Sequence, residues 1–225
     1  TSAANAQVAA IFAASGQSCV AGSRLLVAES IKDAFLARLT EKVRSIHIGP
    51  PDRPDTQFGP LCTRQQQERI AAIVSRSLEQ GAKLVIGHAA IDLPGFYYPP
   101  TIVDCSAQPD AECVKQELFG PVLSVLTFRD EAEAIQLAND SAYGLAAGIF
   151  TQNLTRAHRV TRRLRVGVVW LNTYRAVSPL APFGGYGQSG FGREGGIDAA
   201  LQYTTSKTVW LRTSDDPIDD PFVMR

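Results

Sequence analysis

The 225-residue chain lacks a long apolar run, an excess of charge of either sign and a recognisable leader segment. Without a run of about 18 apolar residues, no transmembrane helix is predicted. The 22 basic and 22 acidic residues cancel, so the chain has no long-range field that would attract nucleic acid or an anionic membrane. The first residues have neither the basic nor the apolar region of a signal peptide, and no Met precedes Thr1. We therefore expect a cytoplasmic protein, a piece of a longer chain, that binds neither nucleic acid nor membranes.

Spacings typical of metal sites and disulfide frameworks are missing too. The four cysteines stand at positions 19, 62, 105 and 113 without a C-x-x-C pair, and the three histidines lie far apart in the sequence. Four scattered cysteines in a chain of this length favour reduced thiols, as in a cytosolic protein. We therefore expect no metal ion.

Short extended patterns alternate with helical patterns along most of the chain. The expected helices, with their caps, cover residues 3–14, 30–46, 63–81, 130–139 and 153–164. The expected strands cover residues 24–28, 83–86, 98–103, 122–128, 145–150 and 166–171. This alternation predicts an α/β fold, with a Rossmann-like and largely parallel sheet flanked by helices.

Local signals define the ends of some elements. Ser30 is the expected N-cap of the second helix, whose apolar face would begin at Ile31. Thr63, with Gln66 three residues later, has the pattern of a capping box. The apolar run at 166–171 is typical of a strand that is buried on both faces.

The C-terminal third contains a long loop and a late extended segment. Residues 172–193 are rich in Gly, Pro and Ser, and loops of this length inside compact domains are often functional. Residues 203–212 are rich in β-formers, and such a strand would present unpaired backbone groups to a neighbour. The tail at 215–225 contains four aspartates and two prolines and is expected to be irregular.

Cys19 is the first candidate for chemistry. It follows the helix break at Ser15 and Gly16, precedes the strand at 24–28 and is surrounded by small residues. A thiolate near backbone N–H groups at the end of an element can act as a nucleophile. The alternative is a free cysteine that packs as a small, buried hydrophobe.

Motifs in a fixed order carry a family resemblance. They are Phe12-x-x-x-Gly16-Gln17-x-Cys19-x-Ala21-x-x-Arg24, then Gln116-Glu117-Leu118-Phe119-Gly120-Pro121-Val122, then Asn139-Asp140-Ser141-Ala142-Tyr143-Gly144-Leu145-Ala146-Ala147, and finally Asn172 with Pro182-Phe183-Gly184-Gly185 and Ser189-Gly190-x-Gly192-Arg193-Glu194. Their order and spacing, from about residue 5 to residue 212, resemble the NAD(P)-dependent aldehyde dehydrogenase superfamily.

The resemblance implies that Cys19 is the nucleophile that adds to an aldehyde substrate. The Cys19 backbone N–H would be one donor of the oxyanion hole. Hydride would pass to NAD or NADP, and water would hydrolyse the remaining thioester to a carboxylic acid.

The resemblance also assigns cofactor and substrate contacts. Glu117 would bind the hydroxyls of one cofactor ribose and Phe119 would pack beside the nicotinamide. Gln66 and Arg69 lie on the capped helix where the family touches the other ribose. In the substrate channel, Phe183 would form part of the wall. A carboxylate behind the site would come from Glu194.

Several parts of the family pattern lie outside this chain. The general-base glutamate, the Asn that completes the oxyanion hole and the nucleotide-binding domain precede the cysteine in the family. The resemblance therefore implies a catalytic domain at 1–202 followed by an oligomerisation strand and tail at 203–225. We expect the full-length protein to be a homodimer or homotetramer, and the chain alone to be inactive.

The long loop also spells G-x-G-x-x-G, at Gly185, Gly187 and Gly190. A dinucleotide fingerprint needs a strand directly before it and a helix opening at it, and here the nearest strand ends at residue 171. We therefore interpret the stretch as loop. The family has a Lys where this chain has Gly187, so the local contacts differ.

Three alternative functions stay open from the sequence. A cysteine hydrolase would need a histidine within hydrogen-bond reach of Cys19. A non-catalytic assembly protein would keep the fold without using the thiol. A CoA-acylating aldehyde dehydrogenase would pass the thioester to coenzyme A instead of water.

Overall fold

The computed structural model describes residues 2–89 and 91–223. A four-stranded sheet lies at the centre of its larger part. Its strands are β1 (Arg24–Ala28), β2 (Lys83–Ile86), β3 (Thr101–Asp104) and β4 (Val122–Phe128). The order is β1-β4-β3-β2, with β4 parallel to both β1 and β3 and with β2 antiparallel at the edge. The predicted α/β fold with a largely parallel sheet is confirmed.

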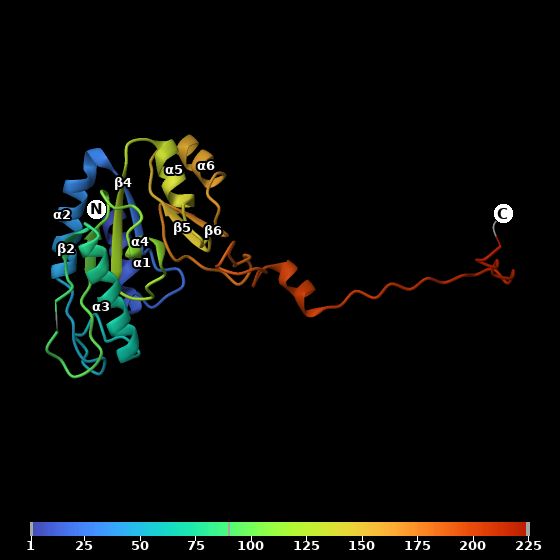
Figure 1. Cartoon of the computed structure of the whole chain (residues 1–225), viewed down its shortest axis with the longest axis horizontal. Helices are drawn as coiled ribbons and strands as arrows, with labels where there is room; N and C mark the ends of the chain where they lie inside the picture. Colours follow the sequence, from blue (N-terminus) through green and yellow to red (C-terminus); the bar gives the residue numbers. More distant parts are fainter. Residues whose placement is uncertain (1, 90, 224–225) are drawn as a thin grey trace.

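Helices cover both faces of this sheet (Figure 1). They are α1 (Ser2–Phe12), α2 (Lys32–Arg44), α3 (Arg64–Glu79) and the short α4 (Glu112–Lys115). Strand β4 separates two apolar clusters: Val122 and Leu126 pack in the cluster with α3, and Leu123 and Val125 pack in the cluster with α1 and α2. This alternation buries β4 on both faces, as expected of a central parallel strand.

A second, two-stranded parallel sheet follows. It consists of β5 (Ala146–Ile149) and β6 (Val168–Leu171), accompanied by α5 (Glu131–Asn139) and α6 (Leu154–Thr161). The prediction that residues 166–171 are buried on both faces is wrong. In β6 only Trp170 is buried, at 5% exposed, because a two-stranded sheet cannot enclose a strand between neighbours.

The two predicted helix caps have different outcomes. Thr63 caps α3, since its hydroxyl accepts a hydrogen bond from the Gln66 N–H at 3.2 Å. The Ser30 cap is wrong: Ser30 lies in a 3₁₀ turn (Glu29–Ile31), and α2 begins at Lys32 without a side-chain cap. Because this turn shifts the helix, Ile31 is 52% exposed and does not begin the apolar face.

Arg24 joins the central sheet to α5. Its Nη2 donates to the Leu137 carbonyl at 2.7 Å, at the C-terminal end of α5, where a cation also opposes the negative end of the helix dipole. Burial lowers the pKa of Arg24, with the Asp140 carboxylate acting in the opposite direction.

We expect Arg24→Met to lower the free energy of unfolding by about 2 kcal/mol, because the substitution leaves a carbonyl without its charged donor. Urea denaturation measures this change. Arg38→Met is the matched control, since Arg38 lies on the exposed side of α2. An Arg24→Met midpoint equal to that of the control would show that the contact does not stabilise the fold.

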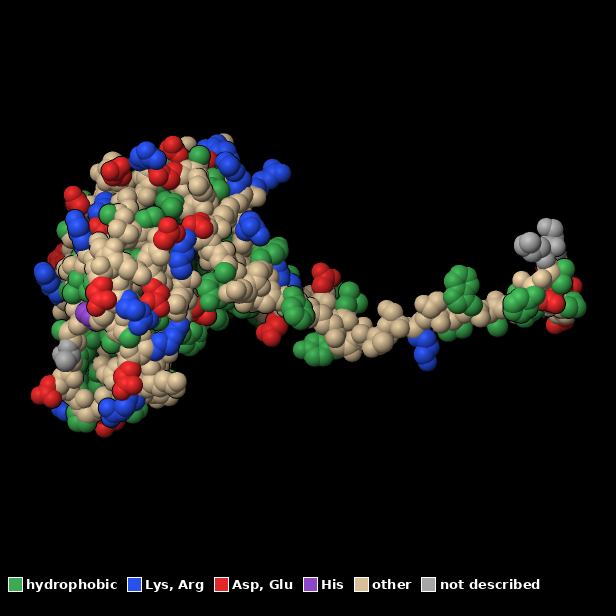
Figure 2. All heavy atoms as spheres, in the orientation of Figure 1, with side chains coloured by type: hydrophobic (Ala, Val, Ile, Leu, Met, Phe, Trp, Pro, Cys, Tyr) green, Lys and Arg blue, Asp and Glu red, His purple; other side chains and the backbone are tan. Residues whose placement is uncertain are grey.

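The C-terminal segment projects from the body of the molecule (Figure 1). After a 3₁₀ helix (Ile197–Tyr203), residues 204–212 form no strand, and Trp210 is 93% exposed. Figure 2 shows apolar side chains along this projecting segment, which include Val209 and Leu211. Pairing with a neighbouring subunit needs a second chain, so the oligomerisation strand stays a prediction. The described part of the tail, 215–223, has no helix or strand, as expected.

Among residues 2–89 and 91–223, no helix combines the length and the apolar character that a membrane crossing requires. The same residues contain no cluster of three or more His, Cys, Asp or Glu side chains arranged to hold a metal ion.

Candidate active site

Cys19 lies exposed in a tight turn between α1 and β1. Ala14, Ser15 and Gly16 have positive φ angles of 53°, 54° and 71°, and this kink ends the first helical segment. The Ala21 N–H then donates to the Ser18 carbonyl at 3.0 Å and closes the turn around Cys19. The alternative of a buried, small hydrophobe is therefore wrong for this cysteine.

The turn leaves hydrogen-bond donors free beside the sulfur. In the part of the chain that the structure describes, the N–H groups of Cys19 and Val20 have no acceptor. The exposed Cys62 differs, because its N–H donates to the Gln17 side-chain oxygen at 3.0 Å. Cys19 therefore combines an accessible thiol with an available N–H.

Helix α1 anchors the end of the turn. The Gly22 N–H donates to the Ala10 carbonyl at 3.1 Å, and the Gln7 side-chain amide donates to the Gly22 carbonyl at 2.7 Å. These bonds fix the chain as it leaves the turn and enters β1.

Close backbone packing brings the loop of Glu117 and Phe119 against the cysteine loop. A Cβ atom on Gly16 would lie 2.2 Å from the Gly120 carbonyl oxygen, so the two backbones meet where only glycine fits. Glu117 is exposed, and Phe119 is 43% exposed with a positive φ of 52°. The structure thus packs the loop of Cys19 against the loop that carries Glu117 and Phe119.

Gln66 and Arg69 hold the same loop from α3. The Gln66 amide donates to the carbonyls of Leu118 and Phe119. Arg69 donates to the Leu118 carbonyl at 3.2 Å and to the Glu117 carbonyl at 3.0 Å. Their polar ends therefore contact the backbone beside the predicted cofactor residues, while direct binding of a ribose stays a prediction.

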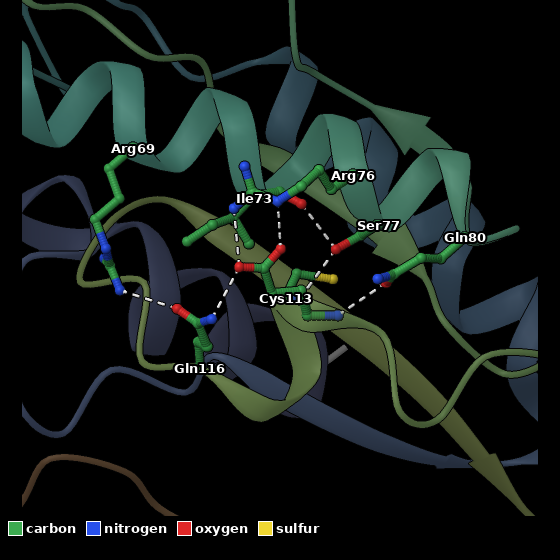
Figure 3. Close-up of polar contacts among 8 residues, drawn as sticks. Arg69, Ile73, Arg76, Ser77, Gln80, Cys113 and Gln116 are labelled. Atoms are coloured by element: carbon green, nitrogen blue, oxygen red, sulfur yellow. Dashed lines mark hydrogen bonds and ion pairs between the residues drawn. The ribbon is translucent and has the colours of Figure 1, made fainter.

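The helix α4 before this loop is clamped to α3 (Figure 3). Arg76 makes a paired contact with Glu112 at 2.7 and 2.9 Å and lowers the pKa of that carboxyl. The Ser77 hydroxyl accepts from the Cys113 N–H at 3.0 Å, and Arg69 reaches the Gln116 side chain at 3.4 Å. These contacts tie the segment that leads to Glu117 to helix α3.

Phe183 and Glu194 pair with each other through their backbones. Each N–H donates to the carbonyl of the other residue at 2.7 Å. They line a hollow of about 350 Å³. Its other lining residues are Val177, Ser178, Pro179, Ala181 and Gly195. The G-x-G-x-x-G stretch within that loop forms turns and a bridge from Gly187 to Tyr143, and no helix opens at it.

One contact to the cysteine turn was missed at the sequence level. The Tyr174 hydroxyl, two residues after the motif residue Asn172, donates to the Val20 carbonyl at 3.0 Å. The Tyr174 ring stacks at a tilt on Trp170, with centroids 4.8 Å apart, and burial raises the pKa of its hydroxyl to about 12. An aromatic residue three positions after the end of β6, inside a Gly- and Pro-rich loop, is the sequence signal that could have found it.

Two of the three histidines, His47 and His88, make contacts away from Cys19. His47 contacts the Asp55 carbonyl at 2.9 Å, and His88 contacts the Tyr98 hydroxyl at 2.9 Å. No hydrogen bond within residues 2–89 and 91–223 joins a histidine to Cys19. The Cys–His contact that a cysteine hydrolase requires is therefore not met in the described residues.

The chain is similar in sequence to known dehydrogenases. The sequence matches the family model described as aldehyde dehydrogenase family over residues 1–209. It is 69% identical to the (Z)-2-((N-methylformamido)methylene)-5-hydroxybutyrolactone dehydrogenase of Acinetobacter baylyi, over 100% of this chain and 46% of that protein. It is 42% identical to a betaine aldehyde dehydrogenase of Cereibacter sphaeroides, over 94% of this chain and 43% of that protein.

Solved structures give the same result. The fold matches betaine aldehyde dehydrogenase from Staphylococcus aureus in complex with NAD+, with a TM-score of 0.92 and 35% identity over 100% of this chain and 45% of that chain. The chain therefore spans about half the length of the relatives it matches. With the family model covering nearly all of its residues, the chain belongs to the aldehyde dehydrogenase family.

Proposed function

We propose that this chain supplies the catalytic nucleophile of an aldehyde dehydrogenase, with Cys19 adding to the aldehyde carbon. The observation that carries the proposal is an exposed cysteine, with its own N–H available, in a loop packed against the loop of Glu117 and Phe119. This packing of two loops that are far apart in the sequence supports the proposal that their motif residues serve one site.

Addition of the Cys19 sulfur to the carbonyl forms a thiohemiacetal and places negative charge on the former carbonyl oxygen. The free Cys19 N–H is a donor for that oxygen, and such donors stabilise the charge as it develops. After oxidation, a thioester remains on Cys19. Water is the proposed acceptor of the acyl group, and coenzyme A is the alternative.

The residues present fit the sugar and nicotinamide end of NAD or NADP. Glu117 offers an exposed carboxylate that can accept hydrogen bonds from two vicinal hydroxyls, and Phe119 offers an exposed ring beside it. The cofactor supplies the hydride acceptor when it is bound. Gln66 and Arg69 would act mainly by holding this loop, because their polar ends already bind its carbonyls.

Phe183 and Glu194 line the proposed substrate side, through the hollow that they share. The substrate class is an aldehyde, and the name of the 69% identical relative makes a hydroxybutyrolactone of that type the first compound to test. The general base and the cofactor-binding domain would come from outside these 225 residues. We propose a cytoplasmic homodimer or homotetramer that pairs through 203–212, with the chain inactive by itself.

Acylation of the thiols tests the proposal. Under limiting p-nitrophenyl acetate, we expect Cys19 to be acetylated about tenfold faster than Cys62, because attack on the ester forms an oxyanion that the free Cys19 N–H can stabilise. Cys62 is the control within the molecule, since it is also exposed but its N–H is occupied. Mass spectrometry of the cysteine peptides measures both rates.

The buried Cys105 and Cys113 should stay unmodified and so report that the fold is intact. Equal acetylation of Cys19 and Cys62 in the intact fold would remove the support for Cys19 as the nucleophile of acyl chemistry.

A further inference from the structure

Two peptide groups connect Tyr174 to the N–H of Cys19. The Tyr174 hydroxyl donates to the Val20 carbonyl at 3.0 Å, and the N–H of that same peptide group, on Ala21, donates to the Ser18 carbonyl at 3.0 Å. The Ser18 carbonyl in turn belongs to the peptide group that carries the Cys19 N–H. The hydroxyl therefore lies at one end of a hydrogen-bonded chain and the proposed oxyanion donor at the other.

A series of hydrogen bonds of this kind makes its terminal donor, here the Cys19 N–H, a stronger one. Each hydrogen bond accepted by a carbonyl polarises its peptide group and makes the N–H on the far side a better donor. These hydrogen bonds also fix the orientation of the peptide groups. The Val20–Ala21 peptide is held on its oxygen and on its nitrogen, and the Ser18–Cys19 peptide is held on its oxygen.

The position of the Tyr174 hydroxyl is itself set by the second sheet. Its ring contacts Trp170 of β6, whose indole N–H donates to the Ala176 carbonyl at 2.8 Å. Asn172 donates to the Thr151 carbonyl and accepts from the Thr151 N–H, both at 2.9 Å. The segment that carries Tyr174 is thus anchored on both sides of the ring.

Glycine at position 148 of β5 lets the ring lie where it does. A Cβ atom there would be 2.5 Å from Cδ2 of Tyr174. Any larger residue would push the ring, and with it the hydroxyl, away from its present place.

We propose that Tyr174 is a positioning residue for the oxyanion donor of Cys19, acting through the Val20–Ala21 and Ser18–Cys19 peptide groups. The inference rests on the proposed function, because it concerns the N–H that would receive the charge. In this role Tyr174 touches neither substrate nor cofactor. The high pKa of its hydroxyl, about 12, keeps it a donor at neutral pH.

Tyr174→Phe tests this inference, since it removes the hydroxyl and keeps the ring. We expect acetylation of Cys19 by p-nitrophenyl acetate to fall about 3- to 10-fold, the range of one neutral hydrogen bond. Alkylation of Cys19 by iodoacetamide forms no oxyanion and should change less than about twofold, within the range of small surface effects. Tyr98→Phe removes a buried hydroxyl that contacts His88 instead of the cysteine turn, so it is the matched control and should change neither rate.

A merely structural role would give a different pattern. It would change acetylation and alkylation of Cys19 together, or it would make the buried Cys105 and Cys113 reactive, and either result would overturn the inference. Unchanged acetylation would also overturn it. Should Tyr174→Phe fail to fold, Gly148→Ala displaces the ring instead and should give the same selective loss.

The two proposals fail separately in these measurements. Equal acetylation of Cys19 and Cys62 in the unsubstituted protein contradicts the proposed function. A preference for Cys19 that Tyr174→Phe leaves unchanged contradicts only the role of Tyr174.

Discussion

Cys19→Ala should lower kcat for aldehyde oxidation by about 10⁴-fold or more in the protein that contains this chain, because no other group can form the thiohemiacetal and thioester. The remaining activity would reflect binding alone. Formation of reduced cofactor in steady state measures the loss, with the aldehyde at saturation and circular dichroism to confirm folding.

Cys62→Ala is the matched control for this substitution. Both cysteines are free and exposed on neighbouring loops, joined by the Gln17 side chain, but only Cys19 has its N–H available. We expect Cys62→Ala to keep kcat within about twofold.

Activity of Cys19→Ala and of the unsubstituted protein separates the remaining alternatives. If Cys19→Ala kept more than a tenth of the activity, a covalent role for this sulfur would be untenable. If the unsubstituted protein had no dehydrogenase activity with any aldehyde and cofactor, a non-catalytic assembly role would be favoured. Dependence of turnover on added coenzyme A would favour the CoA-acylating alternative.

The sequence predicted those features that depend on local patterns. The central strand at 122–128 has the predicted bounds, since a run in which only Ser124 and Thr127 are polar is typical of a strand buried on both faces. The Thr63 cap was also predicted correctly, because a cap depends on residues only three positions apart. The cysteine motif located an exposed turn for the same reason: the break at Ser15 and Gly16 is local.

Features that depend on distant partners were wrong or missed. The run at 166–171 has the composition of a buried strand, but it lies in a two-stranded sheet that leaves most of it half-buried. The second half of the Thr63 capping box is absent, because the Gln66 amide binds carbonyls more than 50 residues away. Tyr174 was missed since its partner, the Val20 carbonyl, is 154 positions distant and carries no side-chain signal.

Gly16→Ala should lower the free energy of unfolding by about 2 to 5 kcal/mol, although it adds only a single methyl group. Two costs add: an L-residue at a φ of +71° loses about 1 to 2 kcal/mol, and overpacking costs about 1 to 3 kcal/mol more. The new Cβ would face the Gly120 carbonyl at 2.2 Å and the Pro121 nitrogen at 2.7 Å. Backbone atoms cannot rotate away, so one of the two loops must move.

Urea denaturation measures the cost, and two glycines nearby serve as controls. Gly59→Ala places its Cβ where no heavy atom lies within 4 Å, so its midpoint should stay close to that of the unsubstituted protein. Gly120→Ala meets Cδ1 of Ile70 at 2.2 Å, which is the far end of a flexible side chain, so its cost should be smaller than that of Gly16→Ala. If the backbones of the two loops are in contact, the loss of stability should decrease in the order Gly16→Ala, Gly120→Ala, Gly59→Ala. A Gly16→Ala midpoint equal to that of Gly59→Ala would mean that the cysteine loop and the loop of Glu117 and Phe119 are not packed as described, and the proposed site would lose the contact that assembles it.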